Sequence, residues 1–222
     1  ASVEMSPCGA HLSRATLAKG GLLSTCCPQP FQRLCAMISL SRRNPLQKAA
    51  ELAYRRVVEQ ARQPGFFSDI GVPDTIDGRF ELICLHAFLF LHRLKGEKPP
   101  APELGQRFFD AMFADFDRSL REMGTGDLSV GRHVKRMAQE FYGRIDAYER
   151  GLSEGDGMLK PALARNLFGT MRPEEPALAA VARYLRREAA RLRERPAAEL
   201  LAGEVSFGDP PLLSAPQAAS AS

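Results

Sequence analysis

The sequence has no tryptophan, and its 222 residues include only five cysteines and four histidines. Four of the cysteines (Cys8, Cys26, Cys27 and Cys35) lie near the start, which leaves Cys84 alone in the rest of the chain. A single cysteine excludes a disulfide bond within that larger part, and this usage fits a reducing compartment. Cys84 stands in an apolar run, where a thiol is usually buried and inert rather than a nucleophile.

Motifs for the common metal sites are also missing. A carboxylate di-iron bundle needs two Glu-x-x-His pairs, and the chain contains none. Cys26-Cys27 has no matching second pair for zinc. Asp110, Asp115 and Asp117 do not match the spacing of the Asp-rich helices of isoprenoid synthases, and no Ser/His/Asp or Cys/His set is visible. We therefore expect no metal, no cofactor and no enzymatic activity, with a helical metal-dependent enzyme as the less favoured alternative.

Long hydrophobic runs are absent. The longest run is Leu82–Leu91, LICLHAFLFL, which has ten residues and includes a histidine. A membrane-spanning helix needs about 20 apolar residues. This run is therefore expected to be a buried helical segment rather than a membrane anchor.

Acidic residues are nearly absent from the first 45 positions, which hold five Lys or Arg and one acid, Glu4. The remainder carries 25 basic and 25 acidic residues, so the net charge of +4 belongs to this leader. A neutral body does not favour DNA or other broad nucleic-acid binding. Residues 1–44 are expected to be a disordered leader, with an organellar targeting segment, a lipoprotein signal or an upstream extension before Met37 as alternative readings.

Apolar residues at helical spacing predict an all-α single-domain bundle of about six helices with disordered termini. The expected domain covers residues 45–202, and residues 203–222 are expected to be a disordered tail. The expected helices carry the apolar series that run from residue 46 to 61, 80 to 94, 104 to 123, 130 to 152, 158 to 168 and 178 to 192.

Helix ends are marked by capping residues. Asp74 or Thr75 is expected to cap the helix before Phe80, and Asp127 or Ser129 the helix before Val130. Gly124, which begins GTGDLSVG, is expected to end its helix in a left-handed conformation. That segment lacks the Lys-Ser/Thr and the preceding strand of a phosphate loop.

Five phrases of the body are individually distinctive: QARQPGFF (60–67), GVPDTIDGRF (71–80), LHAFLFL (85–91), FDAMFADFDRSLREMGTGDLSV (109–130) and MAQEFYGRIDAY (137–148). In this order they resemble the ubiquinol–cytochrome c chaperone family, over roughly residues 46–170. The resemblance implies an assembly chaperone for the cytochrome bc1 complex (respiratory complex III), which binds newly made cytochrome b without catalysis. A helical adaptor for another membrane-protein partner is the alternative.

The resemblance also implies partners and a location. These are a small helical partner subunit, the ribosome exit region, and peripheral association with the inner membrane. The chain would be cytoplasmic in a bacterium, or in the mitochondrial matrix if the leader is a transit peptide. Arg183, Arg187 and Arg191 recur every four residues on the last helix, which suits a solvated face, acidic lipid headgroups or ribosomal RNA.

The candidate partner-binding residues are charged or aromatic residues within these phrases. They are Phe66, Phe67, Asp74, Asp77, Arg79, Asp115, Arg118, Arg121, Glu122 and Asp127. Charge pairing within the bundle is an equal alternative, because Asp117–Arg121 and Arg118–Glu122 have the i,i+4 spacing of helical ion pairs. An apolar client surface would form if several apolar residues were partly exposed, namely Phe66, Phe67, Phe88, Phe90, Phe108, Phe109 and Met112. Helical spacing favours the core for most of them.

Overall fold

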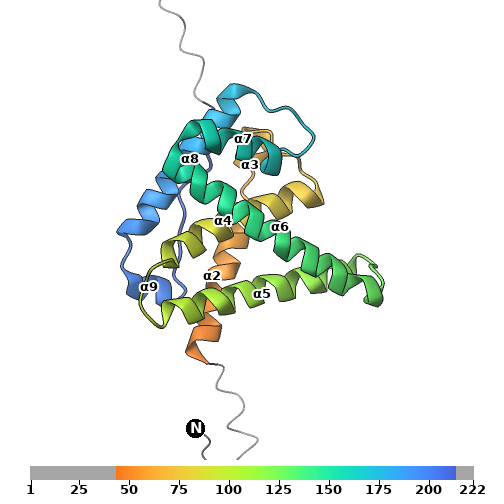
Figure 1. Cartoon of the computed structure of the whole chain (residues 1–222), viewed down its shortest axis with the longest axis vertical. Helices are drawn as coiled ribbons and strands as arrows, with labels where there is room; N and C mark the ends of the chain where they lie inside the picture. Colours follow the sequence, from red (N-terminus) through yellow and green to blue (C-terminus); the bar gives the residue numbers. More distant parts are fainter. Residues whose placement is uncertain (1–43, 214–222) are drawn as a thin grey trace, which may run out of the picture. The chain divides into compact units, whose positions relative to one another are not determined.

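The computed structural model describes residues 44–213 (Figure 1), so the expectations for the leader and for residues 214–222 lie outside the described part. All regular secondary structure in that part is helical. The helices are α2 (Pro45–Ala61), α3 (Gly65–Ser68), α4 (Ile76–Leu94), α5 (Ala101–Glu122), α6 (Asp127–Glu154), α7 (Asp156–Leu167), α8 (Glu175–Glu194) and α9 (Ala197–Leu201). The all-α prediction is confirmed, and six of these helices are the expected ones. The single-turn helices α3 and α9 were not expected.

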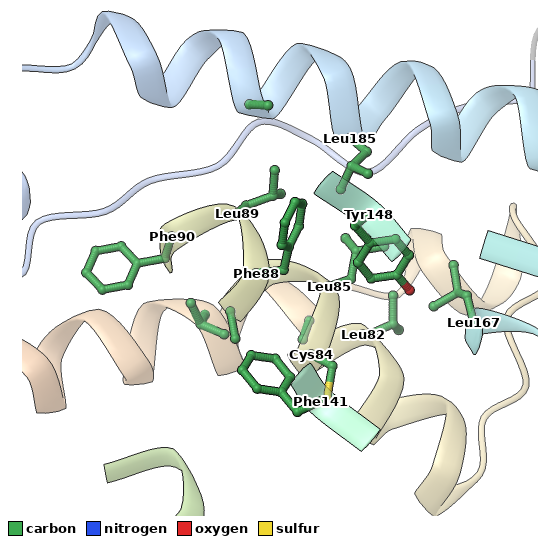
Figure 2. Packing of buried hydrophobic residues seen from close by; sticks show 14 of the residues in the cluster. Leu82, Cys84, Leu85, Phe88, Leu89, Phe90, Phe141, Tyr148, Leu167 and Leu185 are labelled. Carbon is green, nitrogen blue, oxygen red and sulfur yellow. The ribbon is translucent and has the colours of Figure 1, made fainter. Parts of the chain in front are cut away.

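Helix α4 lies at the centre of the bundle and contacts α2, α5, α6, α7 and α8. Its apolar residues face all directions, and Leu82, Leu85, Phe88 and Leu89 are fully buried. Figure 2 shows these side chains among Phe141 and Tyr148 of α6, Leu167 of α7 and Leu185 of α8. A helix that is apolar all round is stable only when other helices cover every face, so this segment fixes where the core forms.

The predicted helix ends are partly confirmed. Thr75 is the N-cap of α4, where its Oγ1 accepts a hydrogen bond from the backbone N–H of Gly78 at 3.1 Å. Gly124 follows α5 with a φ of +84°, as expected for a glycine after a helix. The capping prediction for α6 is wrong, because Gly126 is its N-cap and Asp127 is already helical. Ser129 instead donates from Oγ to the Gly126 carbonyl at 2.7 Å.

Helices α5 and α6 form a hairpin whose end lies at the right-hand edge of the bundle in Figure 1. Aromatic contacts join its two arms, with Phe113 and Phe141 ring centroids 6.2 Å apart. The opposite end of α6 packs closely on α7, where a Cβ on Gly151 would come within 2.8 Å of the Leu159 Cα. The hairpin therefore carries the charged sequence between residues 115 and 127 to the edge of the bundle.

The segment after α9 packs on the helices, so the prediction of a disordered tail from residue 203 is wrong for residues 203–213. Gly203 has a φ of +83° and approaches the backbone of Ala49. Val205 is buried, and Phe207 packs against the core. We call residues 204–211 the strap. Its few apolar side chains are too widely spaced to give a periodic signal in the sequence, which is why the prediction missed it.

Candidate partner-binding site

The two neighbouring phenylalanines of QARQPGFF have different environments. Phe66 is 1% exposed, and its ring centroid lies 5.3 Å from that of His86 and 5.4 Å from that of Tyr184. The expectation of a partly exposed Phe66 is therefore wrong, because the short helix α3 turns this ring into the core. Phe67 is half-buried and remains accessible at the surface.

Phe67 contributes to an open groove of about 750 Å³ where the chain passes from α2 through α3 to the start of α4. We call it the α3–α4 groove, and its lining residues are Arg62, Pro64, Phe67, Ser68, Asp74 and Arg79. The structure thus brings together three of the residues singled out in the sequence, Phe67, Asp74 and Arg79. An aromatic side chain beside ions of both signs is suited to binding a peptide or protein surface.

The ion pair in this groove is exposed. Arg79 Nε donates to Asp74 Oδ1 at 2.6 Å, and both side chains are more than half accessible. The hydrogen bond from Arg79 lowers the pKa of the Asp74 carboxyl, and the same bond raises the pKa of Arg79. Both groups are therefore charged at physiological pH. Exposed pairs of this kind contribute little to stability, which leaves them free to exchange partners.

A second group of predicted residues lies at the end of the α5–α6 hairpin. We call it the hairpin corner, and it consists of the predicted residues Asp115, Arg118, Arg121, Glu122 and Asp127 together with their neighbour Asp117. Arg121 joins the two arms, since its Nε donates to Asp117 Oδ2 at 2.7 Å and its Nη1 to Asp127 Oδ1 at 2.6 Å. The predicted Asp117–Arg121 pair is therefore confirmed. The hydrogen bond from Arg121 lowers the pKa of Asp117.

The predicted pair Arg118–Glu122 is wrong. Arg118 instead bonds to Asp115, one turn earlier on α5. Asp115 also accepts a hydrogen bond from the Tyr54 hydroxyl of α2 at 2.8 Å, which draws its carboxylate toward the body of the protein. Glu122 is exposed and forms no hydrogen bond or salt bridge with the described residues. Asp77 is likewise exposed, in the first turn of α4.

The groove and the hairpin corner flank one aromatic contact. The ring centroid of Phe80, the residue after Arg79, lies 5.1 Å from that of Phe116. In the sequence, Phe116 stands between Asp115 and Asp117. This contact joins the start of α4 to the last turns of α5. The charged residues of both groups are therefore borne on helices that the core holds in place.

Most of the other apolar candidates belong to the core. Phe88, Phe90, Phe108 and Met112 are fully buried, so the core interpretation is confirmed for them and a client surface built from them is excluded in this conformation. Phe109 is half-buried, and its ring stacks on the exposed Tyr142 with centroids 5.6 Å apart.

The Cys84 thiol is fully buried in the core. Burial raises the pKa of the Cys84 thiol well above its usual value, so this sulfur stays protonated.

Within residues 44–213, no group of three or more His, Cys, Asp or Glu side chains is arranged to hold a metal ion. In the same range, no helix is both long enough and apolar enough to cross a membrane.

Arg62, Pro64 and Ser68 were not among the predicted residues. Arg62 follows the last residue of α2, and the structure gives it no salt bridge with a described residue. The sequence signal for Arg62 was its place in QARQPGFF, one of the distinctive phrases. The turn at Pro64 and Gly65 brings the chain after Arg62 back, so that Arg62 lines the same groove as Asp74 and Arg79.

Most of the chain matches one known protein family. Residues 68–207 match the sequence profile described as "Ubiquinol-cytochrome C chaperone". The chain belongs to the ubiquinol-cytochrome C chaperone family. The match begins in α3 and continues into the strap, beyond the domain end predicted at residue 202. It includes Asp74 and Arg79 of the groove and the whole hairpin corner.

Known members of the chaperone family are moderately similar to this chain. It is 27% identical over 140 residues to "Ubiquinol-cytochrome-c reductase complex assembly factor 1" of Xenopus laevis, covering 63% of this chain and 70% of that protein. It is 28% identical over 160 residues to the assembly factor 1 of Homo sapiens, covering 72% of this chain but only 54% of the human protein. The crystal structure of the Cbp3 homolog from Brucella abortus matches it with a TM-score of 0.68 and 36% identity, over 81% of this chain and 97% of that one.

Proposed function

We propose that this protein is an assembly chaperone of the cytochrome bc1 complex that binds newly made cytochrome b without catalysing a reaction. The family match over residues 68–207 carries this proposal. The printed names of the frog and human relatives describe assembly of the ubiquinol–cytochrome c reductase complex. An assembly factor must bind its client reversibly, and the exposed charged and aromatic residues described above provide a surface for that purpose.

The α3–α4 groove is the first candidate contact for the client. Phe67 offers an aromatic surface, and Arg62 offers a positive charge that no described acid neutralises. Asp74 and Arg79 can exchange their mutual ion pair for contacts with a client at small cost, because both are already solvated. A client segment with an apolar residue next to a charged one would fit this arrangement.

The hairpin corner is the second candidate contact. Glu122 and Asp127 are exposed, as is the side chain of Met123. Arg121 holds the two arms together through Asp117 and Asp127, so the surface is presented on a braced turn. Charges at such a surface act mainly on the rate and specificity of association.

Helix α8 offers a surface for the proposed peripheral association with the membrane. Arg183, Arg191 and Arg193 are exposed and form no salt bridge with a described residue, whereas Arg186 and Arg187 pair with Asp156 and Glu188 at 2.8 Å. Unpaired arginines on one helix attract anionic lipid headgroups. A small helical partner subunit and the ribosome exit region complete the proposal, and they rest on the family resemblance.

The experiment is complementation in a cell that lacks its own copy of this gene. The variants are Arg79→Ala in the groove and Arg121→Ala at the corner. Asp146 and Arg150 form an exposed pair on α6 at 2.8 Å, so Arg150→Ala is a matched control. All three variants are expected to stay within about 1 kcal/mol of the parent in free energy of unfolding. Only Arg79→Ala and Arg121→Ala are expected to lower the amount of assembled bc1 complex.

Photo-crosslinking during cytochrome b synthesis tests the contact directly. A crosslinking residue placed at Phe67 or Arg121 is expected to capture cytochrome b, and one at Arg150 is not. Capture of a different membrane protein, with normal bc1 assembly in the two variants, would favour the helical adaptor instead. Normal assembly in cells without the protein would overturn the proposed function itself.

A further inference from the structure

The strap lies against α2, α4 and α8, and we call the surface that it covers the channel. Val205 is 4% exposed, and the Phe207 ring lies edge-on to His86 of α4 with centroids 5.1 Å apart. The strap has no regular secondary structure. Its extended chain therefore occupies the channel as a bound peptide would.

The body holds this segment through its main chain. Gln60 Nε2 of α2 donates to the Gly208 carbonyl at 2.8 Å, and the Gly208 N–H donates to Glu188 Oε2 of α8 at 2.9 Å. Arg187 Nη2 donates to the Asp209 carbonyl at 2.6 Å. These three contacts recognise an extended backbone, as main-chain hydrogen bonds do in other peptide-binding sites.

The side chains that make these contacts are also held by one another. Gln60 Nε2 donates to the Tyr184 hydroxyl at 3.0 Å, and Tyr184 bonds to His86 Nε2 at 2.8 Å. Arg187 Nε donates to Glu188 Oε1 at 2.8 Å. The channel is therefore built largely before the strap enters it, which is the condition for binding a segment that arrives separately.

Two positions of the strap give the channel its sequence preference. An aromatic ring fits at Phe207, against His86. A Cβ on Gly208 would lie 2.8 Å from Glu188 Oε1 and 2.9 Å from Arg191 Nη1, so the ends of both side chains would have to shift. Glu188 is fully buried and has little room to do so. The channel thus favours an aromatic residue followed by glycine.

The strap can leave without breaking a helix. Its backbone–backbone hydrogen bonds, Glu204 to Glu199 and Val205 to Gly203, are both local. Beside it lies an open groove of about 420 Å³, which strap residues 204–207 line together with Leu52 and Arg56 of α2 and Gln63 just after that helix. Departure would cost three side-chain bonds and the burial of a few apolar side chains, and α2, α4 and α8 would stay packed.

We propose that this channel is a binding site for an extended segment of a partner protein, containing an aromatic residue followed by glycine, and that the strap is a tethered ligand which this segment replaces. A tethered ligand competes at a high effective concentration, typically millimolar for a short linker. The partner segment must therefore outcompete it or arrive when the strap has detached. The inference rests on these contacts alone, so a failure of the proposed bc1 assembly role would not contradict it.

The test uses a labelled peptide, GEVSFGDPPLL, which copies residues 203–213. Full-length chain carrying Gly208→Ala has a strap that fits poorly, so the peptide is expected to bind it at least about tenfold more tightly than it binds the parent chain. A peptide with the same Gly→Ala change is expected to bind neither chain. Adding Gln60→Ala to the Gly208→Ala chain should weaken binding again. Equal binding to parent and Gly208→Ala chains, or no effect of Gln60→Ala, would overturn the proposal.

Two further measurements keep the proposal testable if the Gly208→Ala chain does not fold. Phe207→Ala replaces Gly208→Ala if the latter chain does not unfold cooperatively, with the same expected gain in peptide binding. Hydrogen exchange on the parent chain requires no variant at all. Strap amides such as Gly208 are expected to exchange well before the core amides of α4 and α8. Exchange of the strap only together with global unfolding would show that it is a fixed part of the fold.

Discussion

The Tyr54 hydroxyl donates a hydrogen bond to Asp115 Oδ2 at 2.8 Å and so joins α2 to α5 across 61 residues of sequence. Burial, and then the bond to Asp115, raise the pKa of Tyr54, so the hydroxyl remains a donor at any physiological pH. The same carboxylate binds Arg118 on its exposed side. Asp115 thus connects the hairpin corner to α2.

Tyr54→Phe is expected to lower the free energy of unfolding by about 1 kcal/mol, because it removes one partly buried hydrogen bond to a charged acceptor. Arg118→Ala is expected to change it by less than about 0.5 kcal/mol, since that ion pair is exposed. Urea denaturation measures both. A larger loss in Arg118→Ala than in Tyr54→Phe would show that Asp115 is held mainly by Arg118.

The buried pair of Glu81 and Arg144 predicts a second, larger effect. Arg144 Nε donates to Glu81 Oε2 at 2.7 Å, and its Nη2 donates to the other carboxylate oxygen. Arg144→Met should destabilise the fold by about 3 kcal/mol, because it leaves a buried carboxyl without its partner. The double variant Glu81→Leu with Arg144→Met should recover most of that loss. Denaturation curves of the four proteins form the required cycle, and a double variant no more stable than Arg144→Met would contradict the prediction.

His86 predicts how stability depends on pH. It is fully buried, its Nδ1 lies 2.7 Å from the Leu82 carbonyl and its Nε2 bonds to Tyr184, so the geometry fits a neutral ring that donates through Nδ1. Burial lowers the pKa of His86 from 6.5 to about 4. The unfolded chain therefore binds a proton that the folded chain does not, between these two values. Stability should be fully present above pH 6.5 and fall as the pH drops toward 4, by on the order of 3 kcal/mol.

The matched measurement is thermal unfolding of the parent and of His86→Gln between pH 4 and 7.5. The two proteins share their carboxylates, including Glu188 near Tyr184, so the difference between their pH profiles isolates the histidine. Parallel profiles would show that His86 does not cause the acid sensitivity.

Two glycines of α6 provide a test of packing. A Cβ on Gly151 would meet Leu159 Cα at 2.8 Å, whereas one on Gly143 would meet nothing within 4 Å. Gly151→Ala should destabilise the fold by about 2 kcal/mol through overpacking of α6 on α7. Gly143→Ala should stabilise it by roughly 0.5–1 kcal/mol, because alanine is the better helix former. Thermal unfolding measures both, and changes of the same sign would contradict the packing of α6 against α7.

Local sequence patterns predicted the helices well because their causes are local. The apolar run from Leu82 to Leu91 has no polar face, and this alone requires a central position for α4. Thr75 and Gly124 acted as expected, since a cap depends on the few residues next to it. Asp127 did not act as a cap, because the helix has Gly126 as its N-cap and Asp127 is already its first residue; its carboxylate binds Arg121 from the other arm of the hairpin instead.

The candidate site was predicted only in part. Asp117 and Arg121 were correctly recognised as an ion pair. The choice between Asp115 and Glu122 as the partner of Arg118 depends on side-chain geometry that spacing alone does not resolve. Phe66 and Phe67 are identical in type and adjacent in sequence. The turn of α3 decided which of them enters the core and which lines the groove.

By itself, the sequence determined the all-α class, the position of the six main helices and the family, because helical periodicity and distinctive phrases are properties of neighbouring residues. Only the tertiary structure decided that Arg62 joins Asp74 and Arg79 in one groove, and that Tyr54 reaches Asp115. It also decided that the strap lies against His86 and Glu188. These relationships join segments far apart in the chain, and they exist only once the helices have packed around α4.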